Sequence, residues 1–149
     1  MIIRDLDFIY EEGERLIRGE PSTDWARLGR YLVNEGISDR REVISYASNV
    51  ILHLLKCEYQ PEKTSKSWHN SIEESSLCLR EDIKQSKVLY NYLLSNVINA
   101  YRPARHKASR ETNLPLDTFP KECPYVVENL LNEDWIYEFL ENHPIADWG

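Results

Sequence analysis

The chain changes direction within residues 53–68, HLLKCEYQPEKTSKSW. An apolar helical pattern enters this stretch, and an amphipathic helical pattern leaves it. Between the two patterns Gln60 precedes Pro61, and a residue before proline is pushed out of the helical region of φ/ψ space. The stretch therefore predicts two helices that are joined by a short, basic and hydroxyl-rich bend.

The helix that leads into this bend, over residues 39–59, has the widest apolar face of the chain. A face of this width is typical of a central helix in a bundle. Its apolar positions are Val43, Ile44, Ala47, Val50, Ile51, Leu54 and Leu55.

Helical periodicity continues on both sides. Further helices are predicted over residues 3–17, from residue 24 onward, from Ser65 or Ser67 to residue 85, and over residues 87–112. Prolines in the tail predict short helices, with Pro124 in the first turn of one that reaches Leu131. Because the loops are short, we expect an all-α fold: an antiparallel bundle of about five main helices with short proline-pinned C-terminal helices, in a single domain over residues 1–149.

Two apolar stripes lie near the N-terminus. In the first helix the stripe contains Leu6, Ile9 or Tyr10, Gly13 and Ile17. In the second helix it contains Trp25, Leu28 and Leu32. Gly36 leaves two alternatives open, an interruption with a new helix after it or one long helix that is kinked.

Composition disfavours several classes of protein. The net charge of −7 disfavours nucleic acid as a partner, because phosphate binding needs clustered Lys and Arg. With three cysteines at wide spacing we expect no disulfide framework, which favours a reducing compartment. We find neither a signal peptide nor an apolar run of membrane-spanning length. We therefore expect a soluble cytoplasmic protein without a membrane segment.

Candidate chemistry is concentrated at the bend. His53 and Cys57 share a helix face, but zinc needs further ligands that no motif supplies, so we expect neither a metal nor a cofactor. A ligand pocket, or an enzyme with His53 as its acid–base group, would be built from the side chains around the bend. The candidate binding residues are His53, Tyr59, Gln60, Lys66, Trp68 and His69.

The C-terminal region is rich in aromatic residues. Such side chains either pack back on the bundle or form a patch that recruits a partner. We expect packing for Trp135, and the candidate partner-facing residues are Trp135, Tyr137 and Trp148.

A series of motifs resembles a known family. In order along the chain these are Asp24-Trp25 with Leu28, residues 38–42 (SDRRE), residues 53–56 (HLLK), residues 59–61 (YQP), Ser67-Trp68, Leu114-Pro115, Phe119-Pro120 and residues 123–125 (CPY). Together they resemble the bacterial, largely cyanobacterial, domain of unknown function 29. The resemblance covers residues 8–137 and implies an all-helical single domain with no established activity. Cys57 and His69 depart from the family pattern, which usually has Trp and Arg there.

Three functions follow as expectations. The first is a non-enzymatic protein-binding module, with an accessory, inhibitor or antitoxin-like role and a basic partner that complements the acidic chain. The second is a small-ligand-binding protein or enzyme with its pocket near His53 and Trp68. Direct nucleic-acid binding is the third, and a homo-oligomer stays open.

Overall fold

A computed structural model describes residues 6–146 of the chain, and within them every regular element is helical. The α-helices are α1 (Leu6–Ile17), α2 (Trp25–Tyr59), α3 (Lys66–Lys84), α4 (Lys87–Thr112), α5 (Val127–Leu130) and α6 (Glu133–Asn142). Two short 3₁₀ turns are η1 (Pro61–Lys63) and η2 (Leu116–Thr118). The predicted all-α fold is confirmed.

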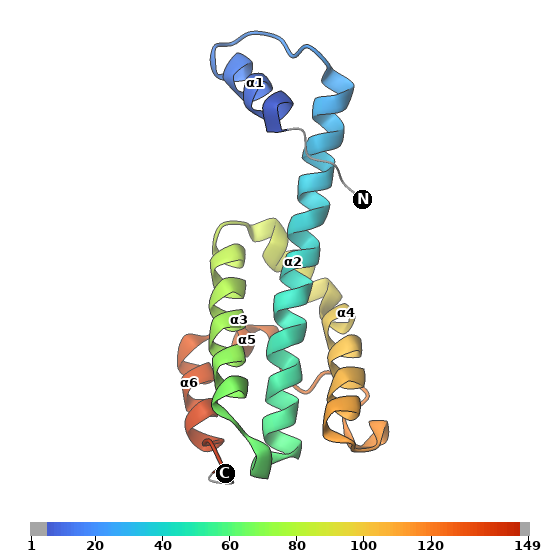
Figure 1. The fold of residues 1–149 in the computed structure, drawn as a ribbon, viewed down its shortest axis with the longest axis vertical. Coiled ribbons are helices and arrows are strands. Elements are labelled where there is room, and N and C mark those ends of the chain that lie inside the picture. The colour runs from blue at the N-terminus through green and yellow to red at the C-terminus, as the bar shows by residue number, and fades with distance from the viewer. Residues whose placement is uncertain (1–5, 147–149) are drawn as a thin grey trace. The chain divides into compact units, whose positions relative to one another are not determined.

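The chain divides into two compact units, Met1–Asp39 and Arg40–Gly149, and α2 contributes residues to both. The hydrophobic core lies in the second unit, where the buried apolar side chains run from Val43 to Leu140. Within that unit the C-terminal half of α2 lies between α3 and α4, and α6 lies beside α3 (Figure 1). The predicted central helix is therefore central, because its wide apolar face is covered on several sides.

Side-chain caps fix the starts of α3, α4 and α6. Ser65, Ser86 and Asn132 each accept a hydrogen bond from the backbone N–H three residues later, at 3.2, 3.2 and 3.1 Å. At the end of α4, Asn113 takes the left-handed conformation with φ of 59°. One boundary was wrong: α5 begins at Val127, so Pro124 precedes the helix instead of lying in its first turn.

Gly36 lies inside α2, and the helix is uninterrupted there. A single glycine costs a helix interior only about 1 kcal/mol relative to alanine. The cost is too small to end a helix whose flanking residues favour it. Of the two alternatives for Gly36, the interruption is not observed.

The C-terminal tail returns to the bend after α2. The Ala146 amide donates to the Thr64 carbonyl at 2.9 Å, and the Nε2 atom of His69 hydrogen-bonds the His143 carbonyl at 2.7 Å. These contacts join the start of α3 to the end of α6, which lie side by side in Figure 1. Within residues 6–146, no helix is both long enough and apolar enough to cross a membrane.

Candidate functional site

The predicted binding residues at the bend each contact a different structural partner. The Nδ1 atom of His53 hydrogen-bonds the Asn49 carbonyl of its own helix at 2.8 Å, and burial lowers the pKa of this half-buried imidazole. The side-chain amide of Gln60 donates to the Thr112 carbonyl at 3.2 Å. Gln60 thus connects the end of α2 to the end of α4.

The aromatic residues of the bend are engaged in packing. Tyr59 meets the Phe119 ring edge-on, with centroids 4.9 Å apart. Lys56, which the sequence did not single out, places its ammonium 4.5 Å from the Trp68 ring centroid and 3.3 Å from a Glu111 carboxylate oxygen. Trp68 therefore forms a cation–π contact inside the unit.

The start of α3 is closed by its own cap. Ser65 occupies the position at which an anion would accept the Trp68 amide proton, while Lys66 is exposed. An anion bound at this helix start would therefore have to displace the Ser65 side chain.

Metal and thiol chemistry are not favoured near His53. Burial raises the pKa of the Cys57 thiol to about 11, so the group stays protonated near neutral pH. Among residues 6–146, no group of three or more His, Cys, Asp and Glu side chains is arranged to hold a metal ion.

The aromatic tail divides between packing and exposure. Trp135 is half-buried, stacks on Phe139 at 5.6 Å and meets Tyr125 edge-on at 6.3 Å. This is the packing that we expected of it. Tyr137 is exposed, and the third partner-facing candidate, Trp148, lies outside the described residues.

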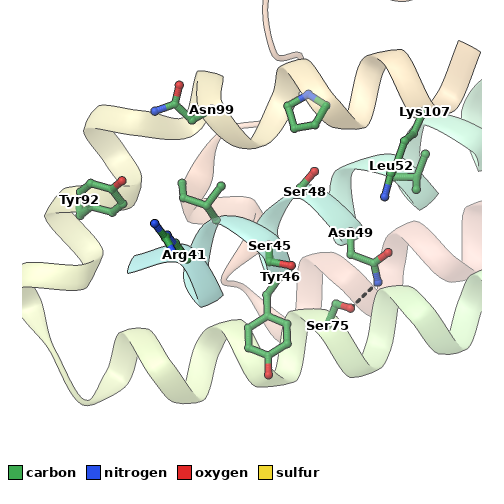
Figure 2. Close-up of a pocket in the computed structure, with 12 residues that line it drawn as sticks. Arg41, Ser45, Tyr46, Ser48, Asn49, Leu52, Ser75, Tyr92, Asn99 and Lys107 are labelled. Atoms are coloured by element: carbon green, nitrogen blue, oxygen red, sulfur yellow. Dashed lines mark hydrogen bonds between the residues drawn. The ribbon is translucent and has the colours of Figure 1, made fainter. Parts of the chain in front are cut away.

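A cavity of about 590 Å³ lies elsewhere, between α2 and α4 in the second unit (Figure 2). None of the predicted binding residues lines it. The lining combines cationic, hydroxyl, amide and apolar side chains and contains no carboxylate. It consists of Arg41, Ile44, Ser45, Tyr46, Ser48, Asn49, Leu52, Ser75, Tyr92, Asn99, Pro103 and Lys107. Sequence reasoning missed this set because its members are spread over three helices.

The first unit is held together by one face of each helix. Glu12 is buried and accepts hydrogen bonds from the amide and the hydroxyl of Thr23, which precedes α2. The Arg27 guanidinium lies 3.9 Å from the centroid of the Phe8 ring. We call these faces of α1 and α2 the inner faces.

The opposite face of α1 is an exposed apolar row. Leu6, Tyr10, Gly13 and Ile17 follow one another at the spacing of one helix face. The exposed fractions of the three large side chains are 67%, 69% and 84% respectively. The N-terminal stripe that the sequence shows is therefore present but is not covered by the rest of the described chain.

The first half of α2 has a matching exposed row. Trp25, Gly29, Leu32, Val33, Gly36 and Ile37 lie within one broad helix face. The four large apolar side chains are between 40% and 63% exposed. A Cβ atom added at Gly29 or Gly36 would meet nothing within 4 Å. We refer to this row and the row on α1 as the outer rows.

Comparison with known proteins gives one match. A family model described as "Domain of unknown function DUF29" matches residues 11–136. No curated protein and no solved structure matches the chain.

Proposed function

Since this chain belongs to the DUF29 family, whose description assigns no activity, we propose from its own surface that it is a protein-binding module. The docking surface is formed by the outer rows of the Met1–Asp39 unit. The exposure of these rows is the observation that supports the proposal, because folded proteins rarely leave contiguous large apolar side chains in water unless a partner covers them.

The gain available from covering these rows is large. Complete burial of one Leu, Ile, Val or aromatic side chain stabilises a complex by about 1.5–3 kcal/mol before the costs of association. The outer rows contain Leu6, Tyr10, Ile17, Trp25, Leu32, Val33 and Ile37. A partner that buried even half of them would have enough apolar contact for specific binding.

The shape of the row on α2 suits another helix. Gly29 and Gly36 are seven residues apart and have open space above them, while Leu32 and Val33 project between them. Small residues allow two helix backbones to approach closely, and the flanking side chains can then pack into the grooves of the second helix. We therefore expect an amphipathic helix as the partner element.

The charge of the unit favours a basic partner. Residues 6–39 contain eight carboxylates and four arginines, a formal charge of −4. On α1, Asp7, Glu11 and Glu14 follow the apolar row at helical spacing, and Arg18 lies 3.6 Å from Glu14, whose charge it partly neutralises. A second copy of the same acidic unit would be repelled, whereas Lys and Arg beside an apolar stripe would be attracted.

An accessory, inhibitor or antitoxin-like role in the cytoplasm fits this proposal. The three cysteines are free, as is usual in a reducing compartment. Binding of this kind needs no catalytic group, so the proposal does not depend on His53.

Affinity purification from the source organism tests the proposal. We expect a helical, basic protein to be retained by the wild-type chain, to be released as salt rises, and to be lost with the double variant Leu32→Asp/Val33→Asp. The partner must then bind the wild-type chain directly when both are purified. Val88→Asp is the matched control, because Val88 is exposed to a similar extent, 62%, but lies in the other unit.

Sedimentation of the purified chain tests whether a second copy of the chain, instead of a different protein, covers the outer rows. A monomer is expected. A dimer that Leu32→Asp/Val33→Asp makes monomeric would identify a second copy as the occupant and contradict the basic partner. Retention of the partner by the double variant would contradict the docking surface itself.

A further inference from the structure

The cavity between α2 and α4 has a charge opposite to that of the whole chain. The chain has a net charge of −7, yet the lining includes Arg41 and Lys107 and no Asp or Glu. Neither cation forms an ion pair with any of residues 6–146. Their charges therefore remain available to a bound anion.

An irregular path of α4 explains why space remains beside α2. Asn96 departs from helical geometry, with φ of −128° and ψ of 20°, and its side-chain amide donates to the Tyr92 carbonyl at 2.9 Å. About two turns later Pro103 lacks the N–H that would bond the Asn99 carbonyl. Helices that depart from the i to i−4 ladder bend at such positions, so side chains of α4 do not fill the groove over α2.

The two cations lie at opposite ends of the cavity. Figure 2 shows Arg41 near Tyr92 at one end and Lys107 near Leu52 at the other. Arg41 and Leu52 are eleven residues apart on α2, which corresponds to about 16 Å along the helix axis. The cavity is therefore elongated, with an exposed cationic side chain in its lining at each end.

The middle of the cavity is mixed in character. Ser48 projects from α2 toward α4 in Figure 2, and Ile44 and Leu52 add apolar surface. The side-chain amide of Asn49 donates to the Ser75 hydroxyl at 2.6 Å, which leaves the side-chain oxygen Oδ1 of Asn49 as an acceptor. A volume of about 590 Å³ is within the range of small-molecule sites, roughly 300–1,000 Å³.

We infer that this cavity binds a small elongated organic dianion, with an acidic group at each end and an apolar middle. Arg41 holds one acidic group through its planar guanidinium, and Lys107 holds the other as a point charge. The site belongs wholly to the Arg40–Gly149 unit and is independent of the proposed partner surface.

Isothermal titration of the full chain with suberate, octanoate and octanediol tests this inference, because the three compounds share a chain length and differ in the number of acidic groups. We expect suberate to bind saturably at one site. Octanoate should bind at least tenfold more weakly, and octanediol should show no saturable binding.

Variants of the cavity give the second half of the test. Arg41→Gln and Lys107→Gln should each weaken suberate binding at least tenfold, and Arg41→Lys and Lys107→Arg should retain most of it. Ser48→Phe should remove binding by filling the cavity. Arg102→Gln is the control, because Arg102 is an exposed cation on α4 outside the lining, and its substitution should leave suberate affinity unchanged.

Three results would overturn the inference. The first is the absence of saturable suberate binding to the wild-type chain. The second is equal affinity for suberate and octanoate, and the third is a loss in Arg102→Gln as large as that in Lys107→Gln. Far-UV circular dichroism of each variant confirms that the helices remain intact.

Discussion

Ser65 marks the point at which the bend after Pro61 becomes a helix. Its side-chain oxygen accepts the Trp68 amide proton at 3.2 Å, which satisfies one of the N–H groups that a helix start leaves without a partner. His69, a candidate binding residue from the sequence, also has a structural role, because its side chain hydrogen-bonds the His143 carbonyl. Single polar side chains at this end of the molecule therefore join helix termini.

Removal of the Ser65 cap should destabilise the second unit. We expect Ser65→Ala to lower the free energy of unfolding by about 1 kcal/mol in urea titrations. Ser67→Ala, two residues later at an exposed position that caps nothing, should change it by less than about 0.5 kcal/mol. Equal losses in the two variants would show that the cap contributes nothing.

Glu12 gives the first unit a pH dependence. Hydrogen bonds from Thr23 hold the pKa of this carboxyl below its ordinary value of 4.5. A lowered folded-state pKa means that the stabilisation is present above pH 4.5 and is lost as the pH falls through the folded-state value.

The Thr23 amide resonance reports this titration directly. We expect its proton chemical shift to change with a midpoint below 4.5 in the wild-type chain and to lose that transition in Glu12→Gln. Glu11→Gln, at the exposed neighbouring position, should leave the transition in place. A midpoint at or above 4.5 would contradict the assignment of the Thr23 bonds.

At the scale of elements, the glycine that follows α1 and a glycine inside α2 have different roles. Gly19 follows α1 with φ of +76°, and the amides of Gly19 and Glu20 bond the Leu16 and Arg15 carbonyls, which is the arrangement of a glycine-terminated helix end. Gly29 lies inside α2 at an ordinary helical position with open space above it. The positive φ at Gly19 favours glycine, whereas the helical backbone at Gly29 accepts other residues.

Alanine substitutions should therefore act in opposite directions. Gly19→Ala should destabilise the first unit by about 1–2 kcal/mol, because a Cβ atom is disfavoured in the left-handed region. Gly29→Ala should stabilise α2 by about 0.5–1 kcal/mol. Amide hydrogen exchange of α1 and α2 measures both effects.

The same Gly29→Ala variant separates stability from partner binding. If a partner helix approaches the outer row of α2 closely, the added methyl group should weaken that binding while the free chain becomes more stable. A variant that is more stable and binds the partner with full affinity would show that close approach at Gly29 is not used.

At the scale of the whole molecule, the two units differ in how they are stabilised. The buried apolar side chains between Val43 and Leu140 all belong to Arg40–Gly149. In Met1–Asp39, Glu12 is the buried side chain among the described residues, and the large apolar residues of the outer rows are exposed. Hydrophobic burial therefore supports the second unit much more than the first.

Fragments of the chain should reflect this difference. We expect residues 40–149 alone to unfold cooperatively in urea, with a midpoint close to that of the full chain. Residues 1–39 alone should be mostly unfolded, because short helices without a core are marginal in water. Far-UV circular dichroism distinguishes the two fragments.

This experiment also tests the single domain that the sequence predicts. If residues 40–149 fail to fold, the first unit is required for the core and the chain is one cooperative domain. A stable second fragment would show that the core is independent of residues 1–39.

Much of the architecture follows from local signals. The helix predicted over about residues 87–112 matches α4, whose start is capped by Ser86 and whose end is followed by Asn113 in the left-handed conformation. Pro61 likewise ends α2 as predicted. Such signals depend on a few neighbouring residues, so a sequence contains all the information that they need.

Tertiary structure decided which apolar stripes are covered and where a cavity remains. Periodicity places Ile51 and Leu32 on apolar faces alike, yet only Ile51 is buried, because burial depends on what the rest of the chain brings against a face. Arg41 and Lys107 are 66 positions apart in the sequence. They line one cavity only because α2 packs beside α4, whose path is irregular. The sequence by itself determined the helices, the acidic charge and the family; the exposed outer rows and the cationic cavity depend on contacts between distant residues, which local patterns do not encode.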